Sequence, residues 1–272
     1  ALYLAAAYAV DALNLVDLPR VDEPLPPAER AALDEDVVAE RAETLAMAPG
    51  EVAAGGYSLR VAGLRKLYPP KDPALPPLAA VRNLTFRVAR GELFGLLGAN
   101  GAGKSTAISC VMRATYPTAG DAHVGGHSVL DDCARAATRL GVVAQQNTLW
   151  DRLSCRAHLR LFARLRGVPE PEVHTVVDAA LDQTELRPHR AKLTKYLSGG
   201  MKRKLCLAIA LIGDPQIVLL DEPTAGLDPV SRHRLWDLIV ATMGERAVVL
   251  TSHNMTEVET LCTKIGIMTH GQ

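Results

Sequence analysis

The chain has 272 residues, and its 30 basic and 30 acidic side chains give a formal net charge of zero, so no electrostatic reason exists to expect nucleic-acid binding. This length accommodates one α/β domain and a smaller appendage, and the aromatic content of only 4% leaves aliphatic side chains to fill the core. The five cysteines are scattered without a C-x-x-C pair, which argues against a disulfide framework or a zinc site and favours a reducing, cytosolic setting.

The N-terminal residues 1–16 form an apolar stub. The chain starts with Ala1 rather than Met, so we interpret it as a fragment of a longer polypeptide. The apolar run stops at Asp11, short of the about 20 apolar residues that span a bilayer, and it lacks the positive start of a signal peptide. We expect either the cytosolic end of a transmembrane helix or an amphipathic helix on the domain.

Residues 17–56 have the composition of an acidic linker. Prolines 24, 26 and 27 interrupt any helix, and residues 28–47 have the pattern of an acidic, solvent-exposed helix. Gly55 and Gly56 separate this segment from the first strand-like stretch, residues 57–61. A main domain over residues 57–272 is therefore expected, with a proline-rich loop at 69–77.

Short aliphatic runs alternate with helical patterns after residue 91. Runs of this kind fit strands that are covered on both faces, and their alternation with helices predicts an α/β fold with a mainly parallel sheet. The runs are 93–97, 140–143, 217–220 and 247–250. Residues 151–194 contain only helical patterns, so we expect a helical subdomain over about 147–200.

A glycine-rich segment, residues 98–105, links the first of these strands to a helix. It reads GANGAGKS and matches G-x-x-x-x-G-K-[ST], a pattern that is meaningful in this strand-to-helix context. Glycines allow backbone N–H groups to surround phosphate oxygens, and the helix N-terminus adds positive potential. The candidate phosphate-binding residues are Gly98, Asn100, Gly101, Ala102, Gly103, Lys104, Ser105 and Thr106.

Polar side chains follow the other three predicted strands. Asp221 and Glu222 end the run 217–220, Gln145 follows residues 140–144, and His253 follows residues 247–252. Ligands in open α/β sheets bind at these carboxyl ends, so Asp221 is a candidate Mg²⁺ ligand and Glu222 a candidate general base. Taken alone, each group could equally be a solvated strand terminus, and a lone Gln or His is more often a surface residue.

The segment Leu197-Ser198-Gly199-Gly200-Met201 precedes another helical pattern. Lys202, Arg203 and Lys204 occupy its first turn, where cations oppose the helix dipole. That placement is explained if the helix end faces an anion, and the alternative is a solvated basic face.

Together these motifs resemble the nucleotide-binding domain of ATP-binding cassette (ABC) transporters over about residues 57–271. The resemblance identifies residues 98–105 with Walker A, Gln145 with the Q-loop, 217–222 with Walker B and 197–200 with the signature. It further identifies 225–228 with the D-loop, His253 with the switch histidine and Tyr68 with the aromatic that stacks on adenine.

This resemblance implies a P-loop NTPase cassette with a parallel core, a small antiparallel part and a helical subdomain. Its cofactors are ATP and Mg²⁺, with metal ligands among Ser105, Gln145 and Asp221, and Lys104, Gln145, Glu222 and His253 act in hydrolysis. The implied partners are transmembrane domains and a second cassette bound head to tail, whose ATP would be contacted by Ser198, Gly199, Gly200 and Asp228. The cassette would lie on the cytosolic face of a membrane, with no nucleic acid expected.

A narrower resemblance points to subfamily A, whose members mostly move lipids and sterols. It rests on the segment LSGGMKRKL at 197–205 and on the acidic run at 34–41. Two departures stand out: Ala144 occupies a position that is often Pro, and the 69–77 loop is long. Trp150 is either a partner anchor or a core residue. The competing interpretations are a soluble ABC-type ATPase acting on nucleic acid or ribosomes, and a degenerate cassette that binds ATP only structurally.

Overall fold

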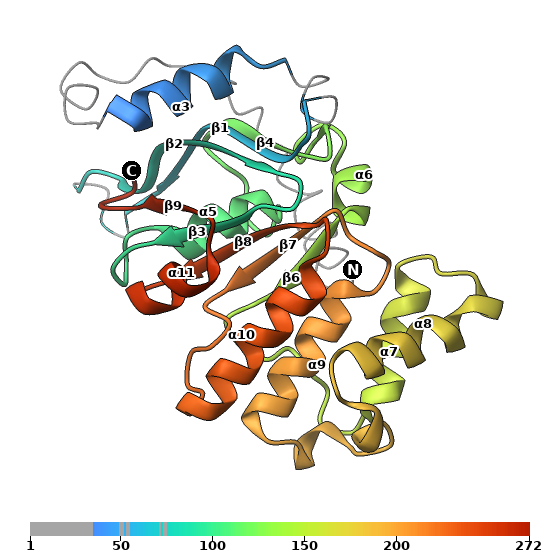
Figure 1. Ribbon diagram of the computed structural model, residues 1–272. Coiled ribbons are helices and arrows are strands. Elements are labelled where there is room, and N and C mark those ends of the chain that lie inside the picture. The colour runs from blue at the N-terminus through green and yellow to red at the C-terminus, as the bar shows by residue number, and fades with distance from the viewer. Residues whose placement is uncertain (1–34, 49–51, 53–54, 71, 73–74) are drawn as a thin grey trace. The chain divides into compact units, whose positions relative to one another are not determined.

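The computed structural model describes residues 35–48, 52, 55–70, 72 and 75–272 (Figure 1). The predicted apolar stub and the linker up to residue 34 lie outside the described residues. The described chain divides into two compact units. We call residues 91–95 and 138–265 the helical unit, and residues 35–90, 96–137 and 266–272 the β unit.

The β unit contains an antiparallel sheet with the strand order β2-β1-β4-β5. Strand β1 (Tyr57–Tyr68) pairs with β2 (Leu78–Ala89) and with β4 (Ala119–Val124), and β5 (His127–Ser128) follows at the edge. The buried side chains of β1 include Leu59, Val61 and Leu64. The same unit contains α5 (Lys104–Val111), while α6 (Cys133–Thr138) lies at its end.

Helix α3 (Glu35–Ala46) is mostly exposed, as the sequence predicted, and its remaining face packs against β1 and β2. Arg41 donates hydrogen bonds to the Asn83 carbonyl and to the Thr85 hydroxyl, both at 3.0 Å. Arg60 of β1 donates to the Thr44 carbonyl at 2.9 Å. Glu40 and Glu43 of α3 also pair with Arg87 of β2, so part of the acidic pattern faces the sheet rather than solvent.

The helical unit is built on parallel strands. Strand β6 (Leu140–Val143) pairs with β7 (Ile217–Asp221), and β7 pairs with β8 (Ala247–Ser252), all in parallel. Strands β3 (Leu93–Leu97) and β9 (Lys264–Ile267) extend this sheet to the order β6-β7-β8-β3-β9. Every residue of β7 and β8 is buried, as expected of strands covered on both faces.

The helices of this unit are α7 (Cys155–Leu165), α8 (Glu170–Gln183), α9 (Gly199–Leu211), α10 (Pro229–Met243) and α11 (Met255–Leu261), with short 3₁₀ turns at Arg187–His189 and Thr194–Tyr196. Figure 1 shows α9 between α10 and the α7–α8 pair, and it contacts all three helices. Close packing of α9 on β6 requires Gly141, because a Cβ there would lie 2.4 Å from the Ala210 carbonyl oxygen.

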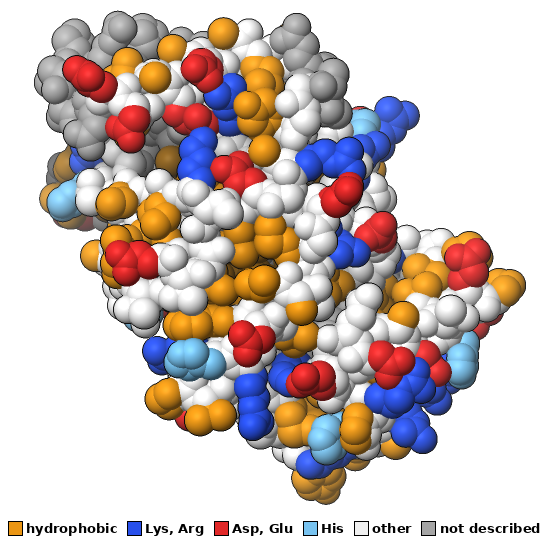
Figure 2. Space-filling model, viewed as in Figure 1, with side chains coloured by type: hydrophobic (Ala, Val, Ile, Leu, Met, Phe, Trp, Pro, Cys, Tyr) orange, Lys and Arg blue, Asp and Glu red, His pale blue; other side chains and the backbone are white. Residues whose placement is uncertain are grey.

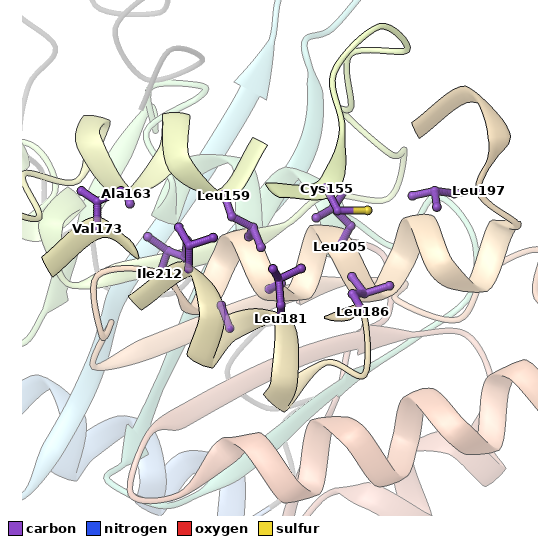
Figure 3. Packing of buried hydrophobic residues seen from close by; sticks show 12 residues of the cluster. Cys155, Leu159, Ala163, Val173, Leu181, Leu186, Leu197, Leu205 and Ile212 are labelled. Carbon is purple, nitrogen blue, oxygen red and sulfur yellow. The ribbon is translucent and has the colours of Figure 1, made fainter. Parts of the chain in front are cut away.

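A separate apolar core joins α7, α8 and α9 (Figure 3). Leu159, Leu181 and Leu205 are fully buried in it, and Ile212 closes it just after α9. The burial of one such leucine contributes about 1.5–3 kcal/mol. This core fixes α9, and with it the turn that precedes α9, to the rest of the helical unit.

The outer surface of α7 and α8 carries paired charges, and Figure 2 shows basic and acidic side chains side by side there. Arg156 contacts Asp178 at 2.6 Å and Arg164 contacts Glu170 at 2.5 Å.

The mixed α/β architecture, with its parallel sheet, smaller antiparallel sheet and helical part, confirms the predicted fold class.

Candidate active site

The predicted phosphate cradle is a tight loop between β3 and α5 in the β unit. Gly101 and Gly103 have φ angles of +83° and +105°, which L-residues with a side chain rarely adopt. A Cβ at Gly103 would lie 2.2 Å from the Ala80 carbonyl oxygen, and one at Gly98 would lie 2.4 Å from that of Met268. The glycines therefore permit both the backbone conformation and the close approach of neighbouring chain segments.

Lys104 is held inside this loop, with only 4% of its surface exposed. Its Nζ donates hydrogen bonds to the carbonyl oxygens of Gly98 at 2.7 Å and Ala99 at 3.0 Å. Asn100, Gly101 and Ser105 are exposed, whereas Ala102 is buried and Thr106 half-buried. No side chain caps α5, whose N-cap is Gly103. A helix N-terminus carries positive potential, which favours an anion at this end of α5.

Tyr68 ends β1 in the same unit and pairs with Leu78. Its ring is 36% exposed, and Lys66 Nζ lies 5.0 Å from the ring centroid. A partly exposed ring at a strand end can stack on a planar base.

Asp221 and Glu222 end β7 in the helical unit. Asp221 pairs with Thr251 of β8, whose hydroxyl donates to Asp221 Oδ1 at 2.5 Å. Glu222 has a φ of +43°, and its N–H donates to the Thr251 carbonyl at 3.1 Å. Positive φ in a residue other than glycine is strained and clusters at functional sites.

The Glu222 carboxylate has a different side-chain partner at each oxygen. Gln145 Nε2 donates to Oε2 at 3.1 Å, and His253 Nδ1 lies 3.2 Å from Oε1. Glu222 is almost buried, with its side chain 10% exposed, whereas that of His253 is 51% exposed. Three residues predicted separately from strand ends therefore meet at one carboxylate, and a different side chain contacts each of its oxygens.

The predicted signature forms the turn before α9. Ser198 is the N-cap, and its hydroxyl accepts a hydrogen bond from the Met201 N–H at 3.3 Å. A Cβ at Gly200 would lie 3.2 Å from the Ser231 hydroxyl of α10. Ser198 and Gly199 are exposed.

Asp228 is the N-cap of α10 and accepts a hydrogen bond from the Ser231 N–H at 3.0 Å. Hydrogen bonds from the Ser231 side chain and backbone lower the pKa of Asp228 below its ordinary value. The carboxylate is exposed, so this predicted site residue combines a capping role with a charged, accessible surface.

The cations that follow the signature do not share one role. The sequence is compatible with cations that face an anion or form a solvated basic face, but Arg203 is 4% exposed and donates to backbone carbonyl groups, and Lys204 pairs with Glu185. Acceptors within the protein therefore account for the positions of Arg203 and Lys204, two of the three cations. Lys202 is half-buried.

Trp150 is not a fully buried core residue, although its ring packs against other rings. Its ring is 43% exposed and stacks on His158 at 5.5 Å and on Phe162 at 6.0 Å between ring centroids. The Trp150 backbone N–H donates to His158 Nε2 at 2.9 Å, and His158 Nδ1 lies 3.0 Å from the Ser154 carbonyl oxygen. A fixed, exposed aromatic side chain therefore stands five residues after Gln145.

Sequence reasoning missed a second buried carboxylate, Glu257 of α11, which is 2% exposed. Thr224, Trp236 and Ser252 donate side-chain hydrogen bonds to it at 2.7, 3.0 and 2.6 Å. Thr224 follows Glu222 by two residues, and Ser252 precedes His253. An acidic residue four positions after His253 was the available signal, but it does not reveal the three donors.

The sequence profile of the ABC transporter family matches residues 81–225. The human phospholipid-transporting ATPase ABCA3 is 42% identical over 240 residues, which cover 88% of this chain and 14% of that protein. ABC transporter A family member 1 of Dictyostelium discoideum is 41% identical, over 88% of this chain and 26% of its own length. Rat ATP-binding cassette sub-family A member 7 is 41% identical, over 94% of this chain and 11% of its own length. The chain thus spans between 11% and 26% of these relatives.

Solved structures show the same architecture. The cbiO1 protein of Clostridium perfringens, part of the ABC transporter complex cbiONQ, has a TM-score of 0.70 at 27% identity and covers 79% of this chain and 86% of its own. An ATP-binding subunit of an ABC transporter has a TM-score of 0.67 at 27% identity, covering 78% of this chain and 86% of its own.

Proposed function

Because the chain belongs to the ABC transporter family, we propose that it binds ATP with Mg²⁺ and hydrolyses the nucleotide to power transport across a membrane. The relatives described above are subfamily A proteins, as the segment 197–205 predicted. One of them is a phospholipid-transporting ATPase, which supports a lipid-like substrate for this protein as well.

The Glu222 carboxylate is the observation that carries the proposal. Gln145 and His253 contact its two oxygens, so the group is oriented, almost buried and able to accept a proton from an attacking water. A degenerate cassette that binds ATP only structurally would not need a carboxylate held in this way. We assign Glu222 as the general base, with Gln145 and His253 as the residues that orient it and the water.

The glycine-rich loop is the proposed phosphate site. Its backbone N–H groups, the uncapped start of α5 and the Lys104 ammonium supply positive potential for the β- and γ-phosphates. Asn100, Ala102 and Thr106 complete the loop, and Tyr68 is the proposed platform for adenine.

Ser105, Gln145 and Asp221 are the proposed Mg²⁺ ligands. They offer hydroxyl, amide and carboxylate oxygens, the donor type that Mg²⁺ prefers, and the exposed Ser105 hydroxyl lies in the first turn of α5. Thr251 donates to one oxygen of Asp221 and so fixes that carboxylate. The bound cation would neutralise phosphate charge.

We further propose a head-to-tail partnership with a second cassette. The exposed Ser198 and Gly199, the half-buried Gly200 and the exposed Asp228 would contact ATP held by that partner. Transmembrane domains complete the transporter, with the cassette on the cytosolic face. Within the described part of the chain, no helix has both the length and the apolar character needed to cross a bilayer. The alternative of a soluble cassette acting on nucleic acid is not favoured by the subfamily A relatives.

The test is to place the full-length protein in phospholipid vesicles and measure phosphate release and movement of a fluorescent phospholipid together. We expect both activities to require ATP and Mg²⁺ and to stop when EDTA removes the metal. Phosphate release without any lipid movement would reject the lipid substrate, and the absence of both would reject the proposed function.

A further inference from the structure

The buried guanidinium of Arg203 is the feature that the proposed function leaves unused. Arg203 is the fifth residue of α9, three residues after Gly200, and is 4% exposed. Burial lowers its pKa below the ordinary value for arginine. Burying a charged group in this way is costly unless every donor has an acceptor.

All five guanidinium N–H donors have acceptors, and every acceptor is a backbone carbonyl oxygen. Nε donates to Pro223 at 2.5 Å, and Nη2 donates to Asp221 at 3.0 Å and Glu222 at 3.1 Å. Nη1 donates to Ala144 and, at 3.3 Å, to Gln145. One side chain thus fixes two separate loops, 144–145 and 221–223, to α9.

These two loops carry the side chains that meet at the proposed base. Gln145 Nε2 donates to Glu222 Oε2, so the contact depends on how the two backbones are held relative to each other. The Glu222 backbone has a strained positive φ and needs outside contacts to keep it. Arg203 supplies two of these contacts by donating to the carbonyl groups of Asp221 and Glu222, which flank the Glu222 Cα.

The signature turn is attached to the same helix. Ser198 caps α9 through the Met201 N–H, and the apolar core of Leu205 and its neighbours keeps α9 rigid. The signature turn and the guanidinium are therefore attached to one helix, and the guanidinium contacts both loops.

We propose that Arg203 is a positioning residue that couples the signature turn to the Gln145–Glu222 pair. It touches neither the nucleotide nor the attacking water. It transmits engagement of Ser198 to the geometry of the base. This inference rests on the proposed function, because it takes the Glu222 carboxylate to be the general base.

The test is a double-mutant cycle in the full-length protein, using R203K and S198A with kcat and KM for Mg-ATP as readouts. Lysine keeps the charge but cannot reach five acceptors as the planar guanidinium does. The control is R166K, because Arg166 is a half-buried arginine that also donates to a backbone carbonyl, that of Leu140, at 2.7 Å. Melting temperatures of all variants separate loss of stability from loss of coupling.

We expect R203K to lower kcat about 10- to 100-fold, because small misplacements of catalytic groups have effects of this size, with KM changed less than about threefold. Adding S198A to R203K should cost less than the product of the single losses. The losses for S198A and R166K should multiply. A kcat for R203K within about twofold of the parent would overturn the proposal. Losses that multiply for R203K with S198A as well as for R166K with S198A would also overturn it.

Hydrogen exchange separates this inference from the proposed function, because it does not depend on turnover. S198A should speed amide exchange at residues 144–147 and 221–225 in the parent but add nothing in R203K. Parent protein without ATPase activity would reject the proposed function, while the exchange pattern would still decide the coupling. Equal effects of S198A in both backgrounds would reject the coupling alone.

Discussion

His253 Nδ1 lies 3.2 Å from Glu222 Oε1. Since Gln145 contacts the other oxygen, the carboxylate plane of Glu222 is fixed from two sides by side chains that follow different strands. Because the carboxylate is held in this way, an isosteric amide at position 222 can test the charge of the side chain separately from its shape.

Glu222→Gln should retain ATP binding and lose turnover by about 10²–10⁴-fold, because the amide keeps the shape but cannot accept the proton. Equilibrium binding of ATP and steady-state phosphate release measure the two effects. Glu172→Gln, at an exposed position on α8, is the control and should change neither quantity. Undiminished phosphate release by the Glu222 variant would reject it as the base.

The sequence predicted the parallel strands and the residues that follow them because aliphatic runs and their polar ends are local patterns. Gln145, Glu222 and His253 could be proposed as neighbours since parallel strands end at one edge of a sheet. Arg203 could not be assigned in this way. Its acceptors are backbone carbonyl groups, which leave no mark in the sequence, and its position in a basic run suggested an external anion. The contacts of α3 and the three donors to Glu257 are equally nonlocal.

Lys104→Ala should raise the Kd for ATP about 10- to 100-fold, since a hydrogen bond to a charged group contributes about 1.5–3 kcal/mol. The ammonium is already held at the loop by the carbonyls of Gly98 and Ala99, so little ordering is needed on binding. Titration with a fluorescent ATP analogue measures the Kd. The exposed Lys192→Ala serves as the charge-matched control, and equal Kd values for the two variants would contradict the phosphate cradle.

Ser198→Arg should spare ATP binding by the isolated chain and abolish hydrolysis by the assembled pair of cassettes. The change also removes the N-cap of α9, at a cost of about 1 kcal/mol. Ser154→Arg is the matched control, because Ser154 caps α7 by accepting from the Ala157 N–H at 3.2 Å. The control should lose similar stability but keep its activity. If binding also fell in the isolated Ser198 variant, a site shared between two cassettes would be wrong for this protein.

Glu257→Gln should lower the free energy of unfolding by about 1–3 kcal/mol, because one acceptor oxygen becomes a donor that faces Thr224, Trp236 or Ser252. Urea denaturation measures this loss. Glu259→Gln, on the exposed side of α11, should stay within about 0.5 kcal/mol of the parent. A Glu257 variant as stable as this control would show that the three hydrogen bonds contribute nothing.

His158 should make stability fall at mildly acidic pH. It is fully buried, and burial lowers its pKa below the ordinary value. Between the folded pKa and the unfolded value of about 6.5, the unfolded chain binds the proton more readily than the folded chain does. The stability that the neutral ring contributes is therefore fully present above this window and declines as the pH falls through it. His158 Nε2 must stay unprotonated to accept the hydrogen bond from the Trp150 backbone N–H, and this requirement also favours the neutral ring.

His158→Gln keeps an acceptor for Trp150 but does not titrate, so the free energy of unfolding should depend less on pH in this variant. Urea denaturation at pH 7.5 and pH 5.5 gives the difference for each protein. His233→Gln, at an exposed position on α10, should behave as the parent does. A parent and a His158 variant with the same loss of stability between the two pH values would show that this ring stays neutral in both the folded and the unfolded chain, or charges equally in both.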